Sequence, residues 1–201
     1  MQEMNSLLSG SASKRRALRR IALLGVCVFG LCACSPERDI NDQLIVAARA
    51  NDIQKVHALI EKGADINARE KVVGEGETAL FHAASMGHNE IVKLLLASGA
   101  MLQEQPNKPT ALIMATWGGH TETVHTLLEN GANPNAKSEG GWTAIAHASR
   151  KGYFEIARLL IEKGAEVNVQ LPDGNTPLSW AKATENPKMV ELLKRAGARG
   201  S

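Results

Sequence analysis

Histidine is the residue type of this chain best suited to metal binding or acid–base chemistry, and six are present. His120 and His125 are five residues apart, a spacing that places two side chains on different faces of a helix. Residues 35–201 contain no His-Glu-x-x-His sequence, no glycine-flanked nucleophilic serine, no phosphate-binding loop and no paired cysteines. We therefore expect no catalytic residues, no metal site, no cofactor and no small-molecule substrate.

The three cysteines, Cys27, Cys32 and Cys34, lie within eight residues of one another. A disulfide framework spreads its cysteines through the fold, so this cluster belongs to a local feature. Basic residues between Lys14 and Arg20 precede an apolar stretch of thirteen residues, Ile21–Ala33. A membrane-spanning helix needs about 20 apolar residues, whereas a basic segment followed by about 7–15 apolar residues is typical of an export signal. An N-terminal core helix is the alternative.

The sequence Leu31-Cys32-Ala33-Cys34 resembles the lipobox of bacterial lipoproteins, with a cysteine in place of the usual small residue two positions before the lipidated one. The resemblance implies that residues 1–33 are a signal peptide that is removed. It also implies that Cys34 carries the lipid and that residues 34–40 form a short tether. Ser35, which is not Asp, implies sorting to the outer membrane by the enterobacterial rule. We expect a protein anchored through Cys34 on the periplasmic face of that membrane.

The charge of the chain is divided unevenly between its two ends. The whole sequence has a net charge of +2, but without residues 1–34 it retains 18 basic and 20 acidic residues. A nucleic-acid-binding domain should be basic where it binds. We therefore expect no nucleic-acid partner.

Gly-Ala pairs recur along the chain at a nearly constant interval. They begin at Gly63, Gly99, Gly131, Gly164 and Gly197, and are separated by 36, 32, 33 and 33 residues. A period near 33 residues indicates a stacked array in which each unit contacts its neighbours. We place the repeats at about 41–69, 76–104, 108–137, 141–169 and 174–198, followed by a tail at 199–201.

Each repeat carries the residues that begin and end a pair of helices. A residue suited to an N-cap stands 21 positions before each glycine: Asp42, Thr78, Thr110, Thr143 and Thr176. A second stretch follows with apolar residues at helical spacing, and the glycine supplies a left-handed C-cap. His82 and His147 hold the same place in repeats two and four, so they should lie on the order of 20 Å apart and cannot share a metal ion.

The segment from Gly76 through Thr78-Ala79-Leu80, Ala83-Ala84 and Gly87-His88 to Gly99-Ala100 resembles an ankyrin repeat. The resemblance covers residues 41–198 and implies an all-α solenoid of five helix-turn-helix units with β-hairpin-like fingers. The family's histidine after Thr-Pro-Leu is replaced here; the substitutes are Phe81, Ile113, Ala146 and Ser179. We expect His88 and His120, which follow a glycine, to have a structural role at the helix junctions.

In ankyrin arrays the fingers and the ends of the first helices face a concave groove that binds proteins. By that resemblance the binding residues are Arg49, Glu75, Glu77, Met86, Trp117, Glu139, Trp142, Arg150, Lys151 and Asn175. We expect exposed rings at Trp117 and Trp142, with packing onto neighbouring repeats as the alternative, and expect Trp180 to pack between repeats. The insertion Lys71–Gly76 is a further candidate for contact, with an inert surface loop as the alternative. The mixed charges favour a protein partner over a polyanion.

Together these features predict a non-catalytic, protein-binding lipoprotein of the bacterial envelope. Export, tethering and a rigid groove resemble periplasmic immunity proteins that neutralise antibacterial effectors of contact-dependent systems such as type VI secretion, secreted phospholipases among them. The alternative is a periplasmic structural or oxidative-stress-related ankyrin scaffold.

Overall fold

A computed structural model describes residues 39–70, 76–102 and 109–199. The predicted signal peptide, Cys34 and most of its tether lie outside these residues, as do Glu75 and the rest of the insertion up to Gly76. No helix within the described ranges is both long and apolar enough to cross a bilayer.

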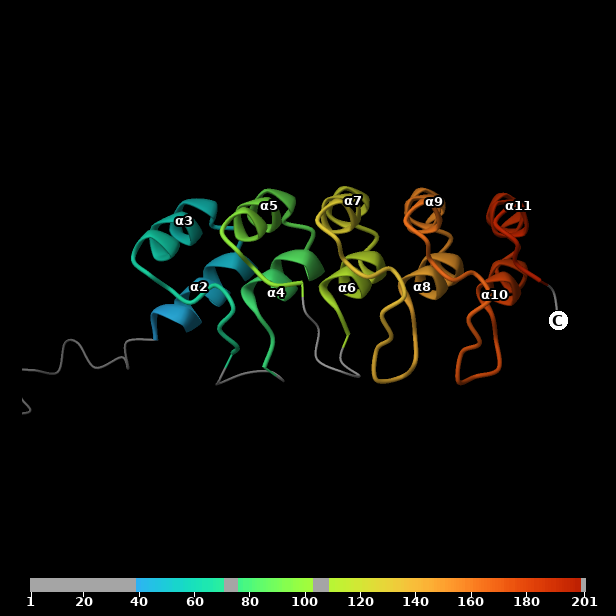
Figure 1. Cartoon of the computed structure of the whole chain (residues 1–201), viewed down its shortest axis with the longest axis horizontal. Coiled ribbons are helices and arrows are strands. Elements are labelled where there is room, and N and C mark those ends of the chain that lie inside the picture. The colour runs from blue at the N-terminus through green and yellow to red at the C-terminus, as the bar shows by residue number, and fades with distance from the viewer. Residues whose placement is uncertain (1–38, 71–75, 103–108, 200–201) are drawn as a thin grey trace, which may run out of the picture. The chain divides into compact units, whose positions relative to one another are not determined.

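The described residues form five helix pairs that stack side by side (Figure 1). The first helices of the pairs pack on one another in one row, and the second helices pack in a second row. The first row comprises α2 (Ile40–Arg49), α4 (Ala79–Ser85), α6 (Ala111–Trp117), α8 (Ala144–Lys151) and α10 (Pro177–Ala183). The second row comprises α3 (Ile53–Glu61), α5 (Asn89–Ala97), α7 (Thr121–Glu129), α9 (Phe154–Glu162) and α11 (Pro187–Arg195). This arrangement confirms the predicted all-α repeat solenoid.

Threonine N-caps begin the first helices of the later repeats, as the sequence predicts. The hydroxyls of Thr78, Thr110 and Thr176 each accept a hydrogen bond from a backbone N–H in the first turn, at 3.0–3.2 Å. Thr143 precedes α8 in the same way, but its hydroxyl is buried and makes no capping bond.

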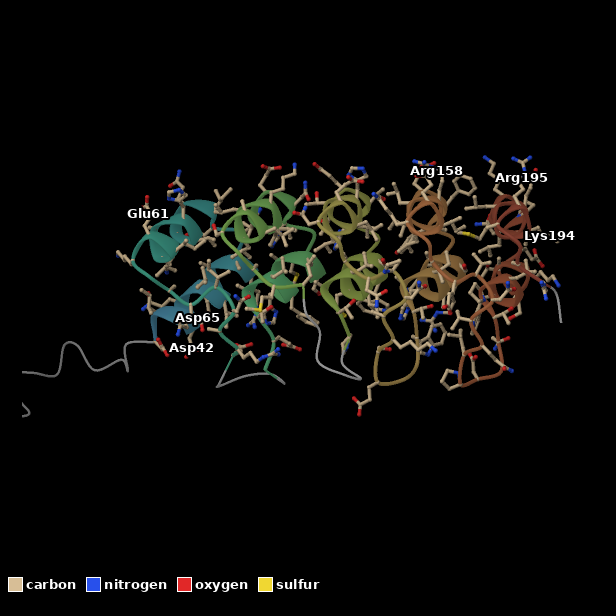
Figure 2. The ribbon with its side chains drawn as sticks, in the orientation of Figure 1. Asp42, Glu61, Asp65, Arg158, Lys194 and Arg195 are labelled. Atoms are coloured by element: carbon tan, nitrogen blue, oxygen red, sulfur yellow. The ribbon has the colours of Figure 1, made fainter. Side chains whose placement is uncertain are left out.

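The prediction that Asp42 caps the first helix is wrong. Helix α2 begins at Ile40, and its N-cap is Asp39, whose carboxylate accepts from the N–H of Asn41 at 3.3 Å. Asp42 lies in the first turn of α2, beside the start of the stack in Figure 2. A carboxylate there still interacts favourably with the positive end of the helix dipole. The repeat register therefore located a suitable residue type but not the helix start.

Small residues on the first helices and larger apolar ones on the second helices build a single core along the stack. Ala48, Ala84 and Ala115 are completely buried where first helices pack against one another, and Leu95 and Leu160 are completely buried on second helices. The alanines allow backbones to approach closely, while each leucine fills the space between the two rows. An isolated pair would expose both surfaces, so stacking holds the fold together.

The fingers that precede α4, α8 and α10 are short antiparallel turns. Arg69 and Thr78 form an isolated antiparallel bridge, with the N–H of Glu70 donating to the carbonyl of Glu77 at 2.9 Å. Comparable bonds of 3.0 Å and 2.9 Å close the turns before α8 and α10. These contacts match the predicted hairpin-like fingers.

A recurring asparagine ties each of three fingers to the next repeat. Asn135 donates from its amide to the carbonyl of Gly164 at 3.0 Å and accepts from the N–H of Glu166 at 2.7 Å. Asn67 and Asn168 each make the same pair of bonds to the repeat that follows them. The asparagine recurs in the sequence pattern Gly-Ala-x-x-Asn, which occurs three times but was not among the predicted contacts.

The histidines after glycine link successive repeats, as expected. The Nε2–H groups of His88 and His120 donate to the carbonyls of Arg49 and Ser85, each at 3.1 Å. To reach the Ser85 carbonyl, the His120 ring lies against Gly87, where an added Cβ atom would clash with Nδ1 of the ring. Glycine at position 87 is therefore required by packing as well as by its φ of +73°.

We predict that Gly87→Ala lowers the free energy of unfolding by about 2–4 kcal/mol, because it adds a steric clash to the cost of a positive φ. Gly99→Ala is the matched control. Gly99 has a φ of +93° but nothing within 4 Å of the added Cβ, so strain alone should cost about 1–2 kcal/mol. Urea unfolding of both variants measures the difference, and equal losses would contradict the packing role of His120.

Candidate protein-binding face

The predicted binding residues that the structure describes lie along one face of the stack. Their positions fall into two lines: the C-terminal ends of the first helices and the fingers before those helices. The first line contains Arg49, Met86, Trp117, Arg150 and Lys151, and the second contains Glu77, Glu139, Trp142 and Asn175. We call this surface the finger face; in Figure 1 it lies on the side of the first helices, where the connections between repeats descend.

The opposite row of second helices has a different character. Its surface carries ion pairs, among them Arg158 with Glu155 at 2.9 Å and Lys163 with Glu129 at 2.8 Å. Figure 2 shows Arg158 and Arg195 extending away from this row. Exposed ion pairs of this kind keep a surface hydrophilic and add little to the free energy of unfolding. Charge on this row is therefore largely matched by neighbouring charge.

Large apolar side chains are exposed on the finger face at repeats two and three. Met86 is 52% exposed and Trp117 is 51% exposed. The Nζ atom of Lys151, from the next repeat, lies 5.8 Å from the centroid of the Trp117 ring. The exposed ring predicted at Trp117 is thus confirmed, with a cation held over its face.

Trp142 is half-buried, and it does not stand free in the way the sequence suggested. Its ring centroid lies 6.0 Å from that of Trp180 and 5.0 Å from that of His147. The guanidinium carbon of Arg150 lies 4.8 Å from the centroid of Trp142 and 5.7 Å from that of Trp180. We call these four residues the Trp142 cluster. Trp180 packs between repeats four and five, as expected, and belongs to the same cluster.

The Trp142 cluster is a site of unbalanced positive charge. Burial, followed by the positive charges of Arg150 and Lys151, lowers the pKa of His147 to about 4. The ring is therefore neutral at pH 7. Within the described residues Arg150 and Lys151 have no ion pair, and the Nδ1 atom of His147 and the Nε1 atom of Trp180 are buried with no hydrogen-bond partner.

A second cluster at the other end of the finger face combines two predicted residues with two that were missed. Arg49 donates from Nη2 to Oε2 of Glu70 at 2.8 Å and to Nε2 of His82 at 2.9 Å. The same Nε2 lies 3.4 Å from Oε2 of Glu77. Burial, followed by the charge of Arg49, lowers the pKa of His82, although Glu77 and Glu70 act in the opposite direction.

Glu70, Glu77 and His82 are close enough to one another to hold a metal ion. A metal ion is not needed to balance their negative charge, because the guanidinium of Arg49 already contacts Glu70 and His82. A neutral His82 that accepts from Arg49 carries its proton on Nδ1. This cluster therefore joins repeats one and two, and its positive and negative charges offset one another. In the Trp142 cluster the positive charge of Arg150 has no such partner among the described residues.

Two predicted residues make few or local contacts. Glu139 is exposed at the tip of its finger. Asn175 accepts from the hydroxyl of Ser179 at 3.0 Å, so its side chain supports the start of α10. Ser179 stands where the ankyrin pattern has histidine, and it forms a reciprocal capping box with Thr176. The substitution thus keeps a local capping bond at this repeat.

These elements define a helix-pair repeat solenoid with a polar and aromatic finger face. A family model of ankyrin repeats matches residues 44–138 and 130–200. The chain belongs to the ankyrin-repeat family, whose repeats form a non-catalytic protein-interaction module. It is a protein-binding scaffold.

Several curated proteins share part of this sequence. Human mitochondrial disaggregase is 40% identical over 86 residues, covering 43% of this chain and 12% of that protein. The ankyrin repeat and KH domain-containing protein mask-1 of Caenorhabditis elegans is 31% identical over 125 residues, covering 61% and 5%. A putative ankyrin repeat protein of fowlpox virus is 32% identical over 112 residues, covering 55% and 33%. The chain therefore spans about a third or less of the length of these relatives.

We predict that stability becomes sensitive to His147 between pH 6.5 and 4. Above pH 6.5 the ring is neutral in both the folded and the unfolded chain. As the pH falls from 6.5 toward about 4, the unfolded chain gains a proton that the folded chain does not, so the free energy of unfolding decreases. Because the ring is partly accessible, we expect a loss of roughly 1–2 kcal/mol across this window.

Urea unfolding at several pH values measures this loss, and His147→Gln should flatten the dependence over the same window. His57→Gln, which removes an exposed imidazole, controls for the loss of a histidine elsewhere. Identical pH profiles for His147→Gln and the parent chain would contradict the assigned protonation state.

Proposed function

We propose that this chain is a lipid-anchored protein of the bacterial envelope that binds a protein partner through its finger face. The observation that carries the proposal is the exposed Trp117 ring beside Lys151, next to the Trp142 cluster in the following repeats. Tryptophan and arginine are the residues most enriched at interface positions that dominate binding energy. The exposed surface of the second row carries ion pairs instead, such as Arg158 with Glu155 and Lys163 with Glu129.

We further propose that the partner is an antibacterial effector and that this chain is its immunity protein. The support is the combination of an N-terminal sequence that resembles an export signal, a resemblance to a lipobox at Cys34 and a protein-binding array a few residues beyond it. Fewer than ten residues separate Cys34 from the start of α2 at Ile40. If fully extended, this segment would span about 20 Å. An array held so close to a membrane would meet a secreted phospholipase before the enzyme reaches lipid.

Cys34→Ser should move the protein from the membrane fraction to the soluble fraction. Each buried methylene of a lipid chain contributes about 0.8 kcal/mol to membrane binding, so loss of the lipid removes nearly all of the anchoring energy. Cys32→Ser is the matched control, because it changes a cysteine two positions earlier and preserves the lipidated one. Fractionation of producing cells checks this, and membrane retention of the Cys34→Ser protein would refute lipid anchoring.

The immunity role is tested by survival of bacteria that express a toxin encoded beside this gene. Cells carrying this chain should survive, and cells carrying Trp117→Ala should survive less well, because we expect the variant to weaken toxin binding by about 2 kcal/mol, or roughly thirtyfold. Ile53→Ala, which truncates an exposed apolar residue on the second row, should protect fully. Survival that does not depend on this chain would rule out immunity and favour the scaffold alternative.

A further inference from the structure

Arg150 is, within the described part of the chain, an unpaired cation held against two aromatic rings. Its guanidinium carbon lies 4.8 Å from the centroid of the Trp142 ring and 5.7 Å from that of the Trp180 ring. Stacking on aromatic rings leaves the edge N–H groups of an arginine free to make two parallel bonds to a carboxylate. Within the described residues no carboxylate of this chain fills that position.

Lys151 extends the same positive site toward repeat three. It follows Arg150 at the end of α8, is exposed, and lies over the ring of Trp117 rather than against an acidic residue. Arg150 and Lys151 are consecutive in the sequence. Arg150 lies against the ring of Trp142, and Lys151 lies over the ring of Trp117.

We propose that Arg150, Lys151 and the rings of Trp117, Trp142 and Trp180 form a site for an acidic segment of the protein partner. Carboxylates of that segment would bind the two cations, and its apolar side chains would cover the exposed Trp117 ring. The site rests on the proposed binding role of the finger face and adds the chemistry of the partner to it.

The surroundings favour a short acidic protein segment over an extended anionic surface. Glu139 and Asp173 are exposed at the tips of the two fingers that flank the Trp142 cluster. The chain after residue 34 has 18 basic and 20 acidic residues. A bilayer of anionic lipid or a nucleic acid would meet these carboxylates as well as the two cations and be repelled by them. A segment a few residues long avoids the fingertips.

The test uses intrinsic fluorescence, because the three tryptophans of the chain are all at this site. The lipidated chain in neutral detergent is titrated at pH 7 with a peptide of six aspartates flanked by glycines, and separately with the matching lysine peptide. The aspartate peptide should change the fluorescence saturably, and binding should weaken as salt is raised from 0.1 to 1 M. No saturable change, or an equal response to the lysine peptide, would overturn the proposal.

Substitutions then identify the groups that bind. Arg150→Gln and Lys151→Gln should each weaken binding of the aspartate peptide by roughly tenfold, whereas Lys188→Gln on α11 should leave it unchanged. Lys151 is exposed, so its variant keeps the test valid even if the Arg150 variant is destabilised. A parallel titration with phosphatidylglycerol vesicles should give no change that depends on these residues. Vesicle binding that is lost in both variants would assign the site to lipid instead.

Failure of this inference can be told apart from failure of the proposed function. If Trp117→Ala abolishes protection against the toxin but Arg150→Gln and Lys151→Gln together do not, the finger face binds the partner without an acidic segment. The inference is then wrong and the function stands. If the aspartate peptide binds as expected but survival does not depend on the chain, the site stands and the immunity role is wrong.

Discussion

Contact between neighbouring repeats is the constraint on which the rest of this structure depends. Apolar residues of each helix pair face the neighbouring pairs, and residues such as Ala84 and Leu95 are fully buried in the stack. Polar links reinforce the same contacts, through His120 to the preceding repeat and through Asn135 to the following one. Because these links recur at the same places in successive repeats, they fix the spacing of the stack.

That regular contact separates residues needed for folding from residues available for binding. Buried alanines, capping threonines and glycines at the junctions occupy the positions that stacking requires. Positions at the ends of the first helices and on the fingers contribute less to the core and differ from repeat to repeat. At one end Arg49 is used in a compensated network with Glu70 and His82, whereas at the other Arg150 is stacked on rings with its charge unmatched. The finger face is therefore electrostatically asymmetric along the stack.

Repeat spacing and residue type were enough to predict the fold class, the helix pairs and most of the helix starts. They failed at Asp42, because a helix can begin at a nearby capping residue, here Asp39, without disturbing the register of the stack. The site was predicted only in part. Register assigns a position to Trp142 and Trp180 but not a side-chain direction, so their stacking on Arg150 became visible only in three dimensions. Glu70 and His82 were missed for the same reason, while the Gly-Ala-x-x-Asn pattern was present in the sequence and was overlooked.

We propose the finger face, and not the row of second helices, as the surface that binds the partner. Hydrogen exchange of backbone amides, measured for the chain alone and with its bound protein partner, distinguishes the two surfaces. Binding at the finger face should slow exchange at the C-terminal ends of α6 and α8 and in the finger at residues 138–142, with α5, α7 and α9 unchanged. Slower exchange confined to α5, α7 and α9 would contradict it.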